Sequence, residues 1–81
     1  MYNVRLSNGG GKKAIEIKVT NVPWNTAWWI VGVGNGAFRD TEIVDNETGE
    51  VAYNRYVSDS VFEADCTVAE VLDLINKLVE D

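Results

Sequence analysis

Residues 32–37, with the sequence Gly-Val-Gly-Asn-Gly-Ala, match the glycine pattern of loops that bind phosphate groups. In that pattern Gly32, Gly34 and Ala37 would let the backbone approach a pyrophosphate at the start of a helix. The residues after Ala37 have no helical pattern of apolar side chains, and the clearest helix of the sequence begins thirty positions later. We therefore expect no phosphate site and no cofactor, and we interpret the glycines as part of a strand and its following turn.

The residue types that usually carry catalysis are scarce, because the chain has no histidine and a single cysteine, Cys66. Without an imidazole there is no Ser-His or Cys-His pair to activate a nucleophile, and nearly all zinc and copper sites are excluded. Cys66 lies between Asp65 and Glu70, which disfavour a reactive thiolate, so we interpret it as a small, partly buried apolar residue. Carboxylates are plentiful, but nothing places two of them in an apolar cleft. We expect neither an enzyme nor a metal site.

Charge is distributed unevenly along the chain. Residues 1–39 contain five basic residues and one acidic residue, a net charge of +4. Residues 40–81 contain twelve acidic residues and two basic ones, a net charge of −10. An excess of negative charge disfavours non-specific binding to a polyanion and favours a partner with a basic surface.

Three tryptophans, at positions 24, 28 and 29, are many for so short a chain. In a strand, adjacent side chains point to opposite faces, so one helix cannot cover both Trp28 and Trp29. We expect one of the two to be exposed, and exposed tryptophan commonly marks a binding hot spot. The candidate partner-binding residues are these tryptophans together with five carboxylates that would imitate phosphates: Trp24, Trp28, Trp29, Glu42, Glu47, Glu50, Asp59 and Glu63.

A second hypothesis is single-stranded nucleic-acid binding. The tryptophans would stack on bases while the basic residues of the first half contact phosphates. The residues assigned to those contacts are Arg5, Lys12, Lys13, Lys18 and Arg39. The net charge of −6 makes this the less favoured of the two hypotheses.

Alternating apolar and polar residues predict two β-hairpins. The first consists of strands at 2–7 and 15–20, with a glycine-rich turn between them. The second consists of strands at 38–44 and 50–57, separated by turn-forming Asp, Asn, Thr and Gly residues. Near the end of the chain, Thr67 and Glu70 form a capping-box sequence, and a continuous apolar stripe then predicts a helix over residues 67–80.

The segment between the hairpins has two interpretations. Residues 27–33 are rich in aromatic and β-branched side chains and contain Gly32, which favours a strand. A short helix is the alternative, since Pro23 suits a first helical position and Trp24, Ala27, Trp28 and Val31 follow helical spacing. We favour the strand, on which Gly32 and Gly34 would leave a flat patch beside Trp28.

Together these elements predict a single α+β domain over residues 1–81. We expect an antiparallel β-meander of about four to five strands, with one C-terminal amphipathic helix packed on one face. The sequence has no secretory signal and no membrane-spanning apolar run, so we expect a cytoplasmic protein without membrane contact.

The favoured function is a small acidic protein-binding module that docks on a basic surface. In charge and size the chain is similar to the short acidic proteins with which bacteriophages and other mobile elements block host nucleic-acid enzymes. That similarity implies an inhibitor with a protein partner. A structural or oligomer-forming domain without catalytic activity stays open, and so does a homodimer, because one helix leaves much of a five-stranded sheet uncovered.

Overall fold

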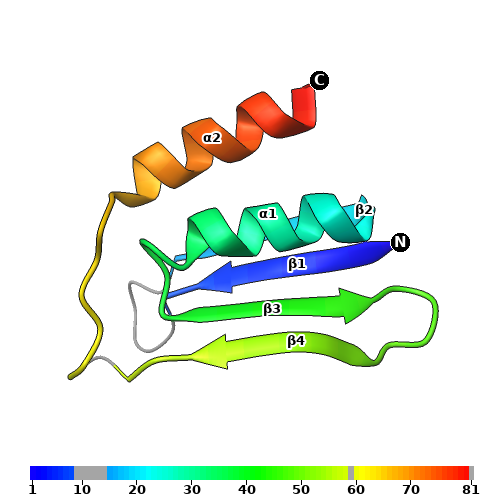
Figure 1. Ribbon diagram of the computed structural model, residues 1–81, viewed down its shortest axis with the longest axis horizontal. Helices are drawn as coiled ribbons and strands as arrows, with labels where there is room; N and C mark the ends of the chain where they lie inside the picture. Colours follow the sequence, from blue (N-terminus) through cyan, green and yellow to red (C-terminus); the bar gives the residue numbers. More distant parts are fainter. Residues whose placement is uncertain (9–14, 59, 81) are drawn as a thin grey trace.

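The computed structural model describes residues 1–8, 15–58 and 60–80, with side chains as far as residue 78. The predicted glycine-rich turn with Lys12 and Lys13 lies outside this description, as does Asp59. The elements follow one another as β1 (Tyr2–Ser7), β2 (Glu16–Val22), α1 (Trp24–Gly34), β3 (Asp40–Asp45), β4 (Val51–Tyr56) and α2 (Val68–Glu80) (Figure 1). The chain is a small α+β fold.

The four strands form one antiparallel sheet in the order β2-β1-β3-β4. The two predicted hairpins are present, but β1 lies between β2 and β3, so the predicted meander is wrong. The central pair is in register from Tyr2 opposite Asp45 to Ser7 opposite Asp40. Because strand side chains alternate between faces, Val4 and Leu6 share one face and Arg5 lies on the other.

The predicted strand at 27–33 is also wrong, because this segment lies within helix α1. Because β1 lies between them and is antiparallel to both, β2 and β3 run parallel, and two parallel strands that follow each other in the chain need a crossover that passes over the sheet. A segment above the sheet cannot pair with the strands, so a helix satisfies its backbone groups internally. The first such bond runs from the amide of Ala27 to the carbonyl of Pro23, at 2.9 Å. Topology therefore outweighs the β propensity of the local sequence.

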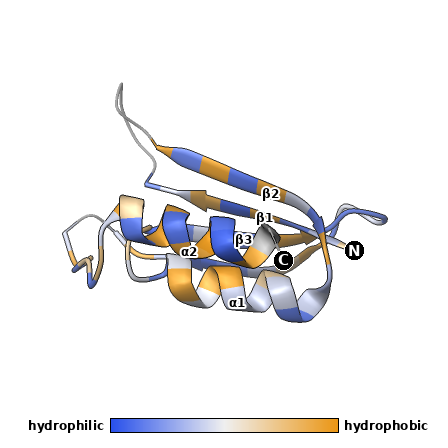
Figure 2. Ribbon diagram, turned by 90° about the horizontal axis from the view of Figure 1, so that it is seen from above, coloured by the Kyte–Doolittle hydropathy of each residue, from blue (hydrophilic) through white to orange (hydrophobic). Residues whose placement is uncertain are grey.

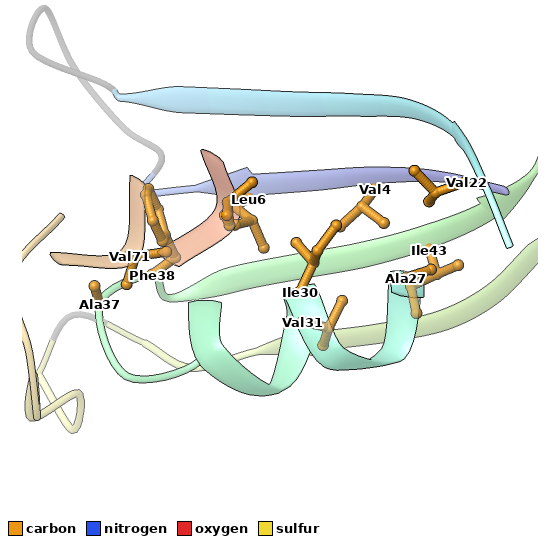
Figure 3. Packing of buried hydrophobic residues seen from close by; sticks show 11 residues of the cluster. Val4, Leu6, Val22, Ala27, Ile30, Val31, Ala37, Phe38, Ile43 and Val71 are labelled. Atoms are coloured by element: carbon orange, nitrogen blue, oxygen red, sulfur yellow. The ribbon is translucent and has the colours of Figure 1, made fainter. Parts of the chain in front are cut away.

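Both helices lie on the same face of the sheet, and the core fills the space between the two layers (Figures 1 and 2). Helix α1 packs over β1 and β3, and α2 runs antiparallel beside α1. Phe38, two residues before β3, is the largest fully buried side chain described. The buried apolar residues are Val4, Leu6, Val22, Ala27, Ile30, Val31, Ala37, Phe38, Ile43, Val71 and Ile75, most of them labelled in Figure 3.

Alanine substitutions at two glycines of α1 are expected to change the free energy of unfolding in opposite directions. A Cβ on Gly34 would lie 2.7 Å from Cδ2 and 2.9 Å from Cδ1 of the buried Leu6 side chain. A Cβ on Gly32 would meet no atom within 4 Å. Gly34→Ala is therefore expected to lower the free energy of unfolding by about 1–3 kcal/mol through overpacking. Gly32→Ala should raise it by up to about 1 kcal/mol, since alanine is the better helix former.

Urea denaturation of the two variants beside the parent chain measures this difference. Because both variants replace glycine with alanine in α1, Gly32→Ala shows how much of the change comes from helix propensity alone. Equal changes in the unfolding midpoint would contradict the close approach of Gly34 to Leu6.

Candidate interaction surface

Four aromatic side chains form a continuous row beside α1. Ring centroids lie 5.2 Å apart between Tyr2 and Trp24, 5.7 Å between Trp24 and Trp28, and 5.0 Å between Trp28 and Tyr53. The two indoles are stacked, with 23° between their planes, and each tyrosine meets its indole edge to face. We call these four residues the aromatic row.

The row exists because α1 lies over the centre of the sheet and not over its β4 edge. Trp24 and Trp28 are four positions apart, so they share one side of the helix. They flank the buried stripe of Ala27, Ile30, Val31 and Gly34. The Trp28 side chain therefore reaches Tyr53 of β4, on a part of the sheet that the α1 backbone does not cover.

All three tryptophans are about half exposed, Trp24 at 42%, Trp28 at 51% and Trp29 at 41%. We expected one of Trp28 and Trp29 to be exposed, because adjacent residues of a strand point to opposite faces. Both are exposed, because the segment is a helix that buries a different side. Trp29 is about 100° further around α1 than Trp28, away from the buried stripe and outside the aromatic row. The structure thus separates Trp29 from the other two.

The spacing of the rings determines what the row can bind. Neighbouring centroids at 5.0–5.7 Å are already in contact, so no cation or small ligand fits between the rings. Only the outer faces and edges of the two indoles can meet a partner. The row is therefore a contact surface for apolar side chains and for guanidinium or ammonium groups that stack on it.

An acidic turn adjoins one end of the row. Residues 45–50 connect β3 to β4, and the Asp45 carboxylate accepts hydrogen bonds from the amides of Glu47 at 2.8 Å and Thr48 at 3.4 Å. The amide of Asn46 donates to the Met1 carbonyl at 3.2 Å, and Asp45 pairs with Tyr2 across the sheet. Within the described part of the chain, Glu47 and Glu50 are exposed and form no ion pair.

The other predicted carboxylates lie elsewhere. Glu42 is on the opposite face of the sheet, where its Oε1 lies 3.6 Å from Nε of Arg5. Glu63 lies in the segment between β4 and α2, at the end of the molecule away from the acidic turn (Figure 1). Asp59 lies outside the described residues. Of the four described carboxylates proposed as phosphate mimics, Glu47 and Glu50 lie in the turn that adjoins Tyr2 of the aromatic row.

On the face of the sheet that the helices do not cover, Arg5 forms ion pairs with two carboxylates of β3. Its Nη2 lies 3.1 Å from Oδ2 of Asp40, in addition to the contact with Glu42. Partial burial lowers the pKa of the Arg5 guanidinium, but the hydrogen bond and charge of Asp40 and the charges of Glu42 and Glu16 outweigh this and raise it. A shallow hollow of about 250 Å³ beside it is lined by Asn3, Val4, Arg5, Lys18, Thr20, Glu42 and Val44.

Of the basic residues proposed for nucleic-acid contacts, Arg5, Lys18 and Arg39 are described, and each is engaged with another part of the chain. Arg5 and Lys18 lie on the open face of the sheet, and each has an acidic partner, since Nζ of Lys18 is 3.3 Å from Glu16. Arg39 donates to the backbone carbonyl of Asn8. The aromatic row lies in the helix layer, so a strand of nucleic acid could not stack on the indoles and contact Arg5 and Lys18 on one continuous surface.

Sequence reasoning missed two members of the row, Tyr2 and Tyr53. Their aromatic character at inward-facing strand positions was visible, but an alternating pattern cannot tell which helix side chain will lie opposite. They come from β1 and β4, which are separated by β3 in the sheet. Only the crossover position of α1 brings both tyrosines to the same indole pair.

Cys66 lies two residues before α2, where the chain contacts the turn between α1 and β3. Its amide and that of Asp65 donate to the Gly36 carbonyl at 3.2 and 2.8 Å, and its side chain packs against the core. Among the residues that the structure describes, no three His, Cys, Asp or Glu side chains are grouped closely enough to hold a metal ion. In the same residues, no helix has the length and apolar character to span a membrane.

These observations leave the aromatic row with its acidic turn as the strongest candidate surface on the described part of the chain. It combines exposed indoles, whose contact with water is unfavourable, with exposed negative charge. Comparison of the chain with protein-family models, with curated proteins and with solved structures found no match, so the surface itself carries the functional argument.

Proposed function

We propose that this protein is a small binding module without catalytic activity of its own, which docks the aromatic row and the acidic turn onto a protein partner. The partner presents Arg or Lys side chains next to apolar ones. The observation that carries the proposal is the stacked pair of half-exposed indoles, Trp24 and Trp28. Tryptophan is among the residues most enriched at binding hot spots.

The size of the exposed surface supports a substantial contribution to binding. The exposed half of one indole side chain is about 100 Å² of largely apolar area. Burying that area contributes roughly 2–3 kcal/mol. Because Trp24 and Trp28 already stack on each other and on the tyrosines, little side-chain entropy is lost when a partner covers them.

Charge supports a basic partner. The chain has a net charge of −6, and the acidic turn next to the row has Glu47 and Glu50 exposed. An Arg side chain of the partner would stack on an indole face and lie near these carboxylates. A protein surface that normally binds nucleic acid has this combination of basic and stacking groups. We therefore propose a nucleic-acid enzyme as the partner and blockage of that surface as the consequence.

Selection from a random peptide display library against the full chain tests the proposal. We expect enrichment of peptides that combine Arg or Lys with an apolar residue, and their affinity should fall as NaCl rises from about 0.05 to 0.5 M. Scrambled peptides in which Arg and Lys are replaced by Glu serve as controls. If no peptides are enriched, or if the enriched peptides carry no basic residues and bind equally at both salt concentrations, the proposal is wrong.

The same protein is expected not to bind single-stranded nucleic acid. Arg5 and Lys18 are paired with acids on the face away from the tryptophans, so phosphate contacts by these two residues cannot act together with base stacking. Titration with mixed-sequence oligonucleotides at low salt should leave tryptophan fluorescence unchanged. Quenching that disappears on addition of salt would support the nucleic-acid hypothesis instead.

A further inference from the structure

The two edges of the sheet differ in how they are protected from strand pairing. The β2 edge carries the Lys18–Glu16 ion pair, has an irregular register with β1, and contains Asn21 at a φ of 61°. Such charges and irregularities keep another strand from pairing with an edge. The β2 edge is thus protected in several ways.

The β4 edge has less of this protection. Its register with β3 is also irregular, between Val51 and Tyr53, but Tyr53 to Tyr56 pair regularly with β3. Its sequence from Val51 to Tyr56 contains no proline, glycine or lysine, and its only charged residue is Arg55. Val51 and Tyr56 are 56% and 65% exposed. In the described chain, no backbone hydrogen bond from outside the sheet involves residues 51–56. The outward backbone groups of β4 are therefore available to an added strand.

We propose that β4 pairs antiparallel with β4 of a second copy of this chain, in the register that places Asn54 opposite Asn54. In this register Arg55 of each copy lies opposite Tyr53 of the other, on the face that carries α1. The register with β3 supports this placement, since Tyr53 pairs with the buried Ile43 and Arg55 with the buried Thr41. Two equivalent Arg–Tyr contacts thus form around the two-fold axis.

Neighbouring registers are less favourable. Centring the pair on Arg55 places the two guanidinium groups opposite each other, which is destabilising. Centring it on Tyr53 leaves Arg55 opposite Val51, without an aromatic or acidic neighbour. In the proposed register the guanidinium lies on Tyr53, whose ring is 5.0 Å from the exposed Trp28 indole, so cation–π attraction favours it. The sequence of β4 is therefore more self-complementary in this register than in either neighbouring one.

The contact is small, and the dimer is accordingly concentration-dependent. Pairing two six-residue strands buries less than about 1,200 Å², which is typical of weak association. Each copy also carries a charge of −6, so added salt screens repulsion between the copies. Salt therefore does not dissociate the dimer, whereas it weakens docking on a basic partner. The two proposals can fail independently.

Sedimentation velocity of the full chain tests the dimer. We expect the mass to rise from 9.0 kDa for one chain towards twice that value as the concentration is raised from about 10 μM to 1 mM. Asn54→Lys places two like charges on the two-fold axis and should weaken association at least about tenfold. Thr20→Lys adds the same charge on the same face at the β2 edge and should leave association unchanged.

A disulfide variant provides a second measurement if Asn54→Lys fails to fold. In a Cys66→Ser background, Asn54→Cys should form a covalent dimer on mild oxidation, because opposite Cα atoms in an antiparallel pair are about 4.5–5.5 Å apart, within the range that a disulfide spans. Thr20→Cys in the same background should stay monomeric. A parent chain that stays at 9.0 kDa at all concentrations, or association that Thr20→Lys disrupts as strongly as Asn54→Lys, would overturn the proposal.

Discussion

Trp28→Ala is expected to weaken binding of a selected basic peptide or protein partner by roughly 100-fold. Trp28 is the most exposed of the three indoles, and it links Trp24 to Tyr53 in the aromatic row. Removing it takes away about 2–3 kcal/mol of apolar contact and the face on which a partner Arg would stack. Isothermal titration calorimetry at one fixed salt concentration measures the change.

Trp29→Ala is the matched control for this prediction. The residue is the same type, lies in the same helix and is 41% exposed, but it is outside the aromatic row. We expect its loss to change affinity less than about threefold, the level typical of contacts outside a hot spot. If Trp29→Ala weakens binding as much as Trp28→Ala, the interface is centred on the outer face of α1. The assignment of the aromatic row as the binding surface would then be wrong.

Phe38→Ala is expected to lower the free energy of unfolding by about 3–5 kcal/mol. Phe38 has no solvent exposure and packs where the end of α1, the start of β3 and α2 meet (Figure 3). A domain of this size has little stability to lose, so a drop of about 15–30 °C in melting temperature should result. Thermal unfolding followed by circular dichroism at 222 nm measures it.

Phe62→Ala makes the same change in the segment between β4 and α2, where the side chain is only partly buried. Its effect should be much smaller, because a less buried ring leaves no cavity when it is removed. Similar losses in the two variants would show that the core does not centre on Phe38.

The strand pattern of this chain was predictable because it rests on a local signal. Predicted strands at 2–7 and 38–44 correspond to Tyr2–Ser7 and Asp40–Asp45. A period of two appears wherever one face of a strand is buried and the other is not, whatever the order of strands in the sheet. The turn at 45–50 was also visible, since Asp45, Thr48 and Gly49 are residues that stabilise turns locally.

Helix α1 was predicted as a strand because its residue types favour a strand while the spacing of its buried residues is that of a helix. Trp28 to Val33 are aromatic and β-branched residues with one glycine, which favours a strand, while Ala27, Ile30, Val31 and Gly34 recur at helical spacing and are the residues buried. A short apolar run of this kind does not distinguish the two. The non-local pairing of β1 with β3 decided the outcome, because it forces a crossover.

The candidate site was predicted in part. The sequence identified exposed tryptophan and negative charge. The structure stacks Trp24 on Trp28 and places the turn that contains Glu47 and Glu50 beside Tyr2, at one end of the row. The sequence did not identify Glu42 as a partner of Arg5, because that pairing depends on the register between β1 and β3. A charge count treats both residues as free, whereas the fold neutralises one with the other.

By itself, the sequence determined the composition-dependent properties of this protein: an acidic chain without histidine, two hairpins, and more indole surface than one short helix can bury. These properties follow from residue types and from spacing within a few positions. The tertiary structure alone decided that α1 is a helix, that Tyr2 and Tyr53 complete the aromatic row, and that Arg5 and Lys18 lie on the other face. Each of these depends on which distant strands become neighbours, and that is decided only when the whole core packs.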